Sequence, residues 1–421
     1  MVTSTPVKLE LQKDLARHLR GGHPWVFKKA IERLPQGIAP GTVIDVMERG
    51  KFVCRGYADP FAAIAVRVLT RDPAEAIGPL FWRKRIAKAV ALRRAFTPFD
   101  QADVTDACRL VHGEGDGLPG VVLDLYGKFA VLKLYSAGLL PHRDAILEAL
   151  RGEVALAGIY GRDDDLTRKR DDDEDDVGDD EDEAPAAKKE KGKVLWGEAP
   201  PDPIVITENG AKIAVDVRTG QKTGLFLDQR ENRLLLRRFS KGRRAINCFS
   251  YTGGFSLNAA LGGAREVVSI DRDAGALALA QKSFELNAPR VDPSKHRTVC
   301  SDVLEFLGAE KQKGAKWDLI VLDPPAYAKT QKAVPAALDG YASLHRAALQ
   351  LMPIGGILAT ASCSARVTAE DFTAAVKEAA GKTGVHLQLL EERRQAPDHP
   401  VPLAFPEGKY LKFLVFRRVD E

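Results

Sequence analysis

Residues 246–260 read INCFSYTGGFSLNAA, and the rest of the chain is organised around them. A short apolar strand, Ala245 to Phe249, is expected to enter a turn at Thr252–Gly254, and a helix is expected from about Phe255. A strand, a glycine turn and a helix open a nucleotide-binding βαβ unit, because glycine lets the backbone approach a ligand and the helix N-terminus offers N–H groups. The glycines do not match the GxGxxG fingerprint, so an ordinary strand-to-helix turn is an equal alternative.

Polar residues end each of the strands expected after this turn. The runs are Glu266–Asp271, Val299–Asp302, Asp318–Asp323 and Gly356–Ser362, the last of which is followed by Cys363. Open parallel sheets bind ligands at the C-terminal ends of their strands. Acids after the second and third strands, without a phosphate-binding fingerprint after the first, favour a nucleoside that carries a carboxylate. S-adenosylmethionine is therefore the expected cofactor.

The composition is typical of a soluble globular protein with two to four domains, since 421 residues are 45% hydrophobic and 29% charged. No apolar run approaches the ~20 residues of a membrane helix, and the first residues contain no signal-peptide core. The five cysteines are scattered and show neither zinc spacing nor a disulfide framework. We expect a cytoplasmic protein without a metal, in which a cysteine is a buried apolar residue unless its position indicates otherwise.

The net charge of +4 hides an asymmetry. Residues 163–183 contain 14 acidic and 3 basic residues, a charge of −11 that leaves +15 for the rest of the chain. A basic chain of this kind favours a polyanionic partner such as RNA. Residues 163–193 are of low complexity and are expected to be a disordered, solvated insertion, although an insertion that covers the basic surface and competes with RNA is the alternative.

Residues 1–75 predict a small β-rich module, with strands near 42–47, 52–57 and 62–69 and a short helix near 13–20. The module has 12 Lys or Arg against 8 Asp or Glu, interleaved with Trp25, Phe27, Phe52 and Tyr57. These aromatic residues suit either an RNA-stacking surface or the core of a small barrel, and the core is the preferred interpretation. His23 is expected to be a structural hydrogen-bonding residue.

Residues 76–202 predict a second small α+β domain. It begins with a helix at 81–97 that has Trp82, Ile86 and Val90 on one face and basic residues on the others. Those basic residues are expected to face solvent, or alternatively RNA phosphates. Strands are expected near 108–112, 121–125, 129–135 and 155–160, with a helix near 142–150. The glycine-rich loop at 113–120 suggests no chemistry by its residues.

The third domain is expected to span residues 203–421 and to begin with a hairpin at Asn209-Gly210, a strong turn signal. The following segment, 220–232, leads into a helix at 230–239. It suits either a lid over the ligand or a linker that caps the helix.

Several motifs along nearly the whole chain resemble one family, the ribosomal RNA large-subunit methyltransferase I family. They are HPWVF (23–27), GEGDGLPG (113–120), KTGLFLDQR (222–230), NCFSYTGGF (247–255), LDPP (322–325), SCS (362–364) and DHP (398–400). The resemblance implies a PUA domain, a central α+β domain and a C-terminal Rossmann-like, class I methyltransferase domain. It also implies an enzyme that uses S-adenosylmethionine to form 5-methylcytosine in 23S rRNA. The acidic insertion and Ala326, where a lysine is common, depart from the family pattern.

Cytosine carbon 5 is a poor nucleophile, so a cysteine thiolate is expected to add first at carbon 6 and form an enamine. Cys363 is the candidate nucleophile because it alone among the cysteines follows a strand at the mouth of the sheet. Asp323 is the candidate partner of the polar edge of the base, held by the rigid Pro324-Pro325 turn. The target base must leave its stack to enter such a pocket. No residue is assigned as the base for the carbon 5 proton, since Ala326 stands where related enzymes have a second cysteine.

The resemblance and the strand-end pattern together imply a set of cofactor contacts. These are Gln229, Phe249, Tyr251, Thr252, Gly253, Gly254, Phe255, Asp271, Asp302 and Asp323. Within the set, residues 251–255 are expected around the methionine portion, Asp271 on the ribose and Asp302 near the adenine amine. The oligomeric state is left open, with a homodimer as one option.

Three other functions are compatible with the sequence. A methyltransferase acting on guanine nitrogen 7 or an exocyclic amine would use Asp-Pro-Pro without a cysteine. An RNA-binding protein with a vestigial Rossmann domain would transfer no methyl group, but the glycine and acidic residues of the site are intact. A dehydrogenase that binds NAD is disfavoured by the missing fingerprint.

Overall fold

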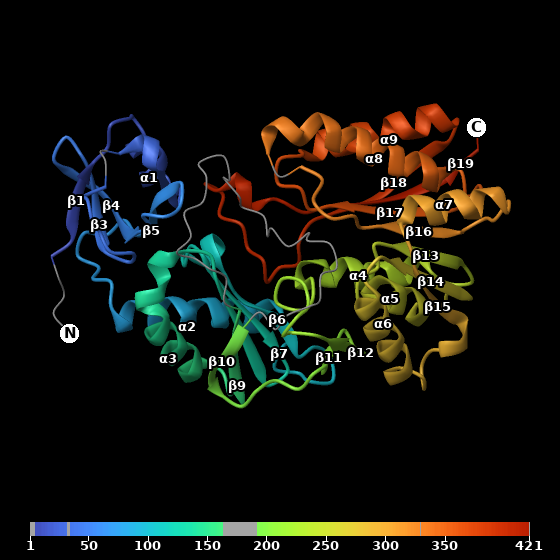
Figure 1. Ribbon diagram of the computed structural model, residues 1–421, viewed down its shortest axis with the longest axis horizontal. Coiled ribbons are helices and arrows are strands. Elements are labelled where there is room, and N and C mark those ends of the chain that lie inside the picture. The colour runs from blue at the N-terminus through green and yellow to red at the C-terminus, as the bar shows by residue number, and fades with distance from the viewer. Residues whose placement is uncertain (1–4, 32–33, 163–191, 329, 421) are drawn as a thin grey trace. The chain divides into compact units, whose positions relative to one another are not determined.

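The computed structural model describes residues 5–31, 34–162, 192–328 and 330–420 (Figure 1). Contacts between Cα atoms divide the chain into two compact units. The first unit contains the described residues up to 162, residues 192–201 and the segment Pro397–Gly408. The second contains Asp202–Ala396 and the residues from Lys409 onward. The acidic insertion lies outside the described residues except for its last two, Gly192 and Lys193, which begin a strand rather than ending a disordered segment.

The first sheet of the first unit has five strands in the order β1-β3-β4-β5-β2. β1 pairs in parallel with β3, and the other neighbours are antiparallel. Its elements are β1 (Val7–Glu10), α1 (Ala16–Arg20), β2 (Trp25–Phe27), β3 (Val43–Glu48), β4 (Lys51–Ala58) and β5 (Ile64–Thr70). The three runs expected from their alternating pattern are thus the adjacent strands β3, β4 and β5.

The second sheet of this unit also has five strands, in the order β10-β9-β8-β7-β6. Its elements are α2 (Pro79–Phe96), β6 (Ala107–His112), β7 (Val121–Tyr126), β8 (Phe129–Leu134), α3 (Arg143–Glu153), β9 (Gly158–Arg162) and β10 (Gly192–Gly197). Apolar residues of α2 and α3 form one core with those of the strands. β10, which the sequence did not predict, pairs antiparallel with β9 across the insertion.

Two aromatic residues considered for RNA stacking lie in the protein interior. Tyr57 is fully buried and donates its hydroxyl to the carbonyl of Pro119 at 2.7 Å. Trp25 donates Nε1 to Glu114 Oε1 at 2.8 Å, and its ring packs edge-on against Phe405 with 4.6 Å between centroids. Both rings are therefore buried rather than available for stacking, but their partners lie outside residues 1–75, and Tyr57 belongs to the core of the second sheet. This corrects the preferred interpretation, because the core of the first sheet contains neither ring.

The cysteines follow the expected burial with one exception. Three are buried, namely Cys54, Cys108 and Cys248, and Cys363 is partly exposed. Cys300 is exposed, which corrects its expected role as a core residue, because β15 is an edge strand and leaves this side chain uncovered. His23 is a structural residue as expected, since its Nδ1 accepts a hydrogen bond from the N–H of Trp25 at 3.3 Å.

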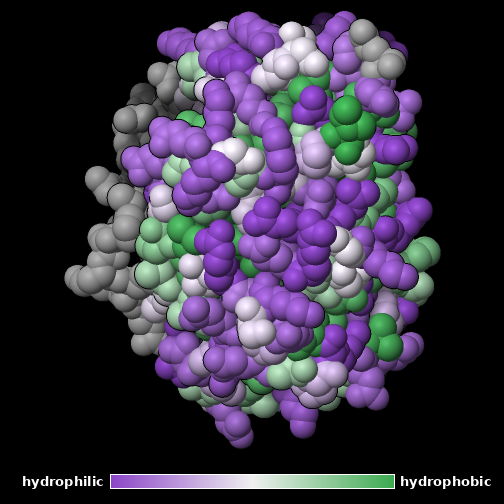
Figure 2. Space-filling model, turned by 90° about the vertical axis from the view of Figure 1, so that its right-hand side faces the viewer, coloured by the Kyte–Doolittle hydropathy of each residue, from purple (hydrophilic) through white to green (hydrophobic). Residues whose placement is uncertain are grey.

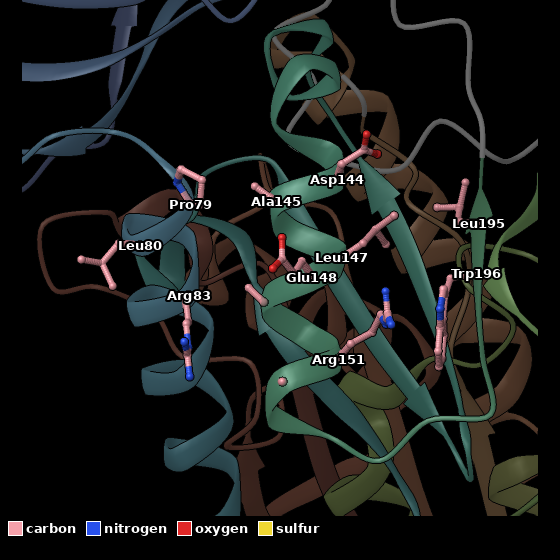
Figure 3. Close-up of a pocket in the computed structure, with 12 residues that line it drawn as sticks. Pro79, Leu80, Arg83, Asp144, Ala145, Leu147, Glu148, Arg151, Leu195 and Trp196 are labelled. Carbon is pink, nitrogen blue, oxygen red and sulfur yellow. The ribbon is translucent and has the colours of Figure 1, made fainter. Parts of the chain in front are cut away.

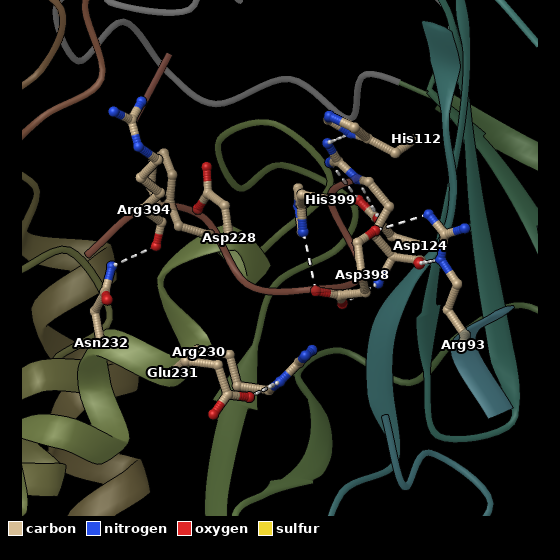
Figure 4. A network of polar contacts seen from close by, with 12 residues as sticks. Arg93, His112, Asp124, Asp228, Arg230, Glu231, Asn232, Arg394, Asp398 and His399 are labelled. Carbon is tan, nitrogen blue, oxygen red and sulfur yellow. Dashed lines mark hydrogen bonds and ion pairs between the residues drawn. The ribbon is translucent and has the colours of Figure 1, made fainter. Parts of the chain in front are cut away.

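Arg93 corrects the expectation that the basic residues of α2 all face outward. The helix does bury the expected apolar face of Trp82, Ile86 and Val90. Arg93, however, is only 1% exposed. Its guanidinium pairs with Asp116 (Nη2–Oδ2, 2.8 Å) and donates to the carbonyls of Asp398 at 2.7 Å and Arg109 at 2.8 Å (Figure 4). A buried guanidinium requires such partners, and the glycine-rich loop supplies the carboxylate.

The segment Pro397–Gly408 clusters with the first unit, although it lies within the range assigned to the third domain from sequence. Asp398 Oδ2 accepts a hydrogen bond from the N–H of Arg109 at 2.9 Å. The ring of His399 lies against that of His112 with 4.9 Å between centroids (Figure 4). The chain therefore leaves the second unit, contributes buried polar groups to the first, and returns.

The second unit contains a seven-stranded sheet in the order β15-β14-β13-β16-β17-β19-β18. The strands are β13 (Arg244–Cys248), β14 (Glu266–Asp271), β15 (His296–Cys300), β16 (Leu319–Leu322), β17 (Ile357–Ser362), β18 (His386–Arg393) and β19 (Lys412–Val419). The first five are mutually parallel, and β19 is antiparallel to both β17 and β18. The C-terminal ends of β13 to β17 therefore meet at one edge, as expected from their terminal polar residues.

Helices cover both faces of this sheet (Figure 1). α4 (Arg230–Leu236), α5 (Gly254–Leu261) and α6 (Ala274–Leu286) lie on one face, and α7 (Val303–Gln312), α8 (Val334–Leu349) and α9 (Ala369–Thr383) on the other. The second group shares a core with the apolar residues of the strands. The expected hairpin is formed by β11 (Ile204–Glu208) and β12 (Ala211–Val215), with positive φ at Asn209 and Gly210 as its tight turn requires.

No helix in the described part of the chain combines the length and apolar character needed to cross a membrane. Figure 2 shows one face of the molecule, which is mainly hydrophilic with apolar residues in small separate groups. Among the described residues, no cluster of three or more His, Cys, Asp or Glu side chains is arranged to hold a metal ion.

The buried pair of Arg93 gives a first prediction. Arg93→Met should destabilise the protein by about 3–5 kcal/mol, because it leaves the Asp116 carboxylate buried without its cation. Arg94→Met, one position along the same helix, is the matched control: its pair with Asp100 is exposed, with side chains 44% and 59% accessible, and should be worth about 0–1 kcal/mol. Urea unfolding followed by tryptophan fluorescence measures both, and equal effects would contradict the assigned role of Arg93.

Candidate functional site

The turn after β13 has an unusual backbone. Phe249, Tyr251 and Gly253 have φ values of 59°, 46° and 72°. Left-handed conformations at two aromatic residues cost energy and are found mainly where a turn is shaped for a ligand. The carboxylate of Asp271 stabilises this turn, since its Oδ2 accepts a hydrogen bond from the N–H of Tyr251 at 2.7 Å.

The two glycines of the turn are needed for packing against the protein itself. A Cβ on Gly253 would lie 2.7 Å from Cβ of Ala280 in α6. A Cβ on Gly254 would lie 2.6 Å from Cδ of Arg233 in α4. The sequence predicted that these glycines let the backbone approach a ligand. The structure shows in addition that they let α4 and α6 pack closely against the turn.

The turn also offers polar groups that suit a bound nucleoside. Within the described residues, the buried hydroxyls of Ser250 and Thr252 have no hydrogen-bond partner. Burial raises the pKa of Asp271, while the N–H groups of Asp273 and Tyr251 act in the opposite direction. Unpaired hydroxyls beside an acid at a strand end fit the ribose and amino-acid portions of S-adenosylmethionine, and they make the turn a suitable cradle for it.

The carboxylate of Asp302 already has hydrogen-bond and ion-pair partners within the protein. It caps α7 by accepting a hydrogen bond from the N–H of Glu305 at 3.1 Å, and it pairs with Arg272 at 2.5 Å. Its side chain is 26% accessible. A contact between Asp302 and the adenine amine stays a prediction.

The segment 220–229 is fastened to the glycine turn. The hydroxyl of Tyr251 accepts a hydrogen bond from the N–H of Gln221 at 3.0 Å and donates to the carbonyl of Gly224 at 3.0 Å. The ring of Phe226 packs edge-on against Tyr251 with 5.3 Å between centroids. Lys222 has a φ of 52° and places Nζ 4.9 Å from the centre of the Phe226 ring. This segment therefore belongs to the site and is more than a linker.

Gln229 and Asp323, both expected site residues, are in contact. Gln229 Nε2 lies 3.2 Å from each carboxylate oxygen of Asp323. Asn232 orients this amide by donating to Gln229 Oε1 at 2.6 Å, and it donates also to the carbonyl of Arg394 at 3.3 Å (Figure 4). This chain of hydrogen bonds from Asn232 through Gln229 to Asp323 orients the carboxyl group.

The proton affinity of Asp323 is raised by its surroundings. Burial, followed by the negative charge of Asp228, raises its pKa to about 7, against the effects of Arg233, Lys222 and the Gln229 hydrogen bond. Asp228 is held by the hydroxyl of Tyr410, which donates to its Oδ2 at 2.7 Å. A carboxyl group with this pKa can act both as a proton donor and as an acceptor near neutral pH.

Cys363 follows β17 and shares its surroundings with Asp323. Burial raises the pKa of its thiol to about 11, with Lys222 and Lys412 lowering it and Asp323 and Asp228 raising it. The residue as a whole is nevertheless only partly buried. β16 and β17 are adjacent and parallel, which brings the residues that follow them to the same edge of the sheet.

Residues at the site that were not named from the sequence include Lys222, Asp228, Asn232, Tyr410 and Lys412. Lys222 and Asp228 lie within the KTGLFLDQR motif, which could have indicated them. No local sequence pattern indicated that Tyr410 and Lys412 belong to the site, because they follow the segment Pro397–Gly408, which belongs to the first unit.

A cavity of about 850 Å³ lies elsewhere, in the first unit (Figure 3). It is lined by residues of α2 and α3 and by Leu195 and Trp196 of β10. The guanidinium of Arg151 covers the Trp196 ring at 4.3 Å. None of the expected site residues lines this cavity.

Comparisons with known proteins identify the families to which the two ends of the chain belong. A family model of S-adenosylmethionine-dependent methyltransferases matches residues 190–417, and a model of PUA-like domains matches residues 9–71. The fold and site thus define a methyltransferase that uses S-adenosylmethionine, joined to an N-terminal PUA-like domain, and they confirm the expected fold class and cofactor.

The chain belongs to the ribosomal RNA large subunit methyltransferase I family. It is 39% identical over 407 residues to the protein of that name from Cronobacter sakazakii, covering 96% of this chain and 98% of the relative. The same protein from Escherichia coli O9:H4 shows the same identity and coverage. The fold matches a proposed S-adenosylmethionine-dependent methyltransferase from Streptococcus mutans, with a TM-score of 0.80 and 23% identity over 98% of this chain and all of that one.

The raised proton affinity of Asp323 predicts a stability effect. Its pKa of about 7 lies above the ordinary value near 4, so the stabilisation from its bound proton is present at low pH and is lost as the pH rises through 7. Asp323→Asn, which keeps an oxygen for Gln229, should therefore be more stable than the unmodified protein at pH 8 by about 2–4 kcal/mol. The difference should shrink toward pH 4.

Urea unfolding at pH 4.5 and pH 8 measures this difference. Asp339→Asn, at an exposed position of α8, serves as the control and should change stability by less than about 0.5 kcal/mol at either pH. If Asp323→Asn is less stable than the unmodified protein at pH 8, the folded protein does not disfavour the ionised form of Asp323, and the prediction is wrong.

Proposed function

We propose that this protein forms 5-methylcytosine in 23S rRNA through a covalent adduct of Cys363 with cytosine carbon 6. The observation that supports the proposal is that Cys363 and a carboxyl group with a pKa of about 7 lie at the ends of adjacent strands and act on each other electrostatically. An exocyclic amine or guanine nitrogen 7 would need the carboxyl group but not the thiol.

The choice of rRNA rests on two further observations. Relatives that match over nearly the whole chain are named for the large-subunit ribosomal RNA. Outside the acidic stretch at 163–183 the chain carries a net charge of +15, which suits a phosphate backbone. The PUA-like domain supplies a separate module for RNA contact, and its inward-facing Trp25 and Tyr57 leave that contact to other side chains.

The proposed chemistry begins with loss of the Cys363 proton and addition of the sulfur to carbon 6 of the cytosine. Electron density then moves toward ring nitrogen 3, where the Asp323 carboxyl group donates a proton. S-adenosylmethionine, when bound, supplies an electrophilic methyl group for carbon 5. After the transfer, which leaves S-adenosylhomocysteine, the carbon 5 proton passes to water. Return of the nitrogen 3 proton to Asp323 then expels the Cys363 sulfur as a thiolate and restores the aromatic ring.

Asp323 suits its part in this sequence. Gln229 donates to both carboxylate oxygens and is itself fixed by Asn232, so the acid cannot rotate away from the base. With a pKa of about 7, a large fraction of Asp323 is protonated at neutral pH and ready to donate. Pro324 and Pro325 restrict the backbone that carries it.

The proposal predicts the behaviour of a nucleophile variant. Cys363→Ala should lower methylation of 23S rRNA by at least about 10³-fold while S-adenosylhomocysteine affinity stays within about twofold, because the thiol contacts the base. Mass mapping of rRNA from cells that express each variant gives the modified nucleotide, and calorimetry gives the affinity. Cys300→Ala, a change at the exposed cysteine, is the matched control and should retain full activity.

A second readout tests the adduct directly. In the presence of S-adenosylmethionine, RNA that contains 5-fluorocytidine should form a stable covalent complex with the unmodified protein and with Cys300→Ala, but none with Cys363→Ala. After methyl transfer, carbon 5 carries fluorine instead of a proton, so the sulfur cannot be expelled. Full methylation by Cys363→Ala, with the product on a guanine or an exocyclic amine, would replace this proposal by a mechanism without a cysteine.

A further inference from the structure

Lys412 is a buried lysine directly beside the proposed nucleophile. It is the first residue of β19 and stands opposite Ser362, the residue that precedes Cys363, in the antiparallel ladder with β17. Only 4% of its surface is exposed. A lysine is rarely buried to this extent, because removing an ammonium group from water is costly.

The hydrogen bonds of Lys412 are all directed to main-chain oxygens. Nζ donates to the carbonyls of Ser364 at 2.6 Å, Val367 at 2.9 Å and Tyr410 at 2.8 Å. An ammonium group has three donors, so none remains for a substrate. Lys412 therefore cannot donate a proton to the base while these bonds persist, and its remaining influence on the site is its charge and the backbone that it holds.

The segment that Lys412 holds is the one that carries Cys363. The carbonyls of Ser364 and Val367 bend around Nζ and fix the chain just after the thiol. On the other side, the hydroxyl of Tyr341 contacts Ser362 Oγ at 2.9 Å and Ser364 Oγ at 3.2 Å. Cys363 is thus fixed from both sides, which reduces the freedom of its sulfur.

The charges around the thiol explain why a cation is needed there. Asp323 and Asp228 disfavour a thiolate at Cys363, and Lys222 and Lys412 favour it. Burial lowers the pKa of Lys412 to about 8, while Cys363 raises it and Arg394 lowers it. Two carboxyl groups and burial thus act against ionisation of the thiol, and only the two lysines oppose them.

We propose that Lys412 is a positioning residue for the reaction, which holds the 364–367 segment against Cys363 and, while it is protonated, supplies a positive charge that stabilises the Cys363 thiolate. The inference rests on the proposed function, in which Cys363 must ionise before it adds to the base. Lys222 is the second cation near the thiol. It lies in the segment that is hydrogen-bonded to Tyr251, and its ammonium group packs over the Phe226 ring.

The experiment measures the thiol without RNA or methyl transfer. The rate at which iodoacetamide alkylates Cys363 is followed against pH by mass spectrometry in a Cys300→Ser background, where the remaining cysteines are buried. Lys412→Met should slow alkylation at pH 8 by roughly tenfold and move the midpoint of the profile up by about one pH unit. Lys412→Arg, which keeps the charge, should move it by less than about 0.3 unit.

The control is Lys316→Met. Lys316 also donates to a carbonyl, that of Gln350 at 3.1 Å, but from an exposed position that does not belong to the site. It should leave the profile unchanged. If Lys412→Met does not fold, Lys412→Gln, which keeps a donor for the carbonyls without the charge, decides the question in the same assay.

A folded neutral variant with an unchanged alkylation profile would overturn the inference. The result is separable from the proposed function: a shifted profile together with full methylation by Cys363→Ala would retain the role of Lys412 toward the thiol and remove the covalent mechanism. An unshifted profile with lost methylation in Cys363→Ala would retain the mechanism and remove the role of Lys412.

Discussion

The chemistry of this protein depends on the removal of ionisable groups from water. Burial disfavours the charged forms of Asp323, Cys363 and Lys412 alike. The charge of Asp323 then acts on Cys363, and the charges of Cys363 and Lys412 act on each other, because electrostatic interactions strengthen where solvent is excluded. The ionisation of the Cys363 thiol therefore depends on the charges of Asp323 and Lys412 as well as on its own burial.

The parallel sheet was predictable because its strands are short apolar runs that end in polar residues. The ends of β13, β14, β16 and β17 could be placed within one or two residues, and the shared edge followed from topology. β18 and β19 were not predicted, and β19 inserts between β17 and β18 in the opposite direction. β10 was missed because it begins inside a stretch whose composition indicates disorder.

Cys363, Asp323 and Gln229 were nameable from the sequence, but the interactions that define their chemistry were not. Asn232 orients Gln229, and Tyr410 and Lys412 approach from the end of the chain, so no local pattern links them to the site. Arg93 shows the same limit, since its partner Asp398 lies 305 positions away and a helical arginine otherwise indicates a solvated face. Long-range pairing of buried charges leaves no periodicity to detect.

The excursion at Pro397–Gly408 has a consequence for how the chain is made. Protein synthesis proceeds from the N-terminus, and domains commonly fold as they leave the ribosome. Here the first unit contains Asp398 and His399, so the Arg93 guanidinium and the N–H of Arg109 lack their contacts with Asp398 until nearly the whole chain has been translated. The first unit is therefore complete only after residues 397–408 have been made, and a nascent chain that stops short of residue 397 lacks the buried contacts that Asp398 makes with Arg93 and Arg109.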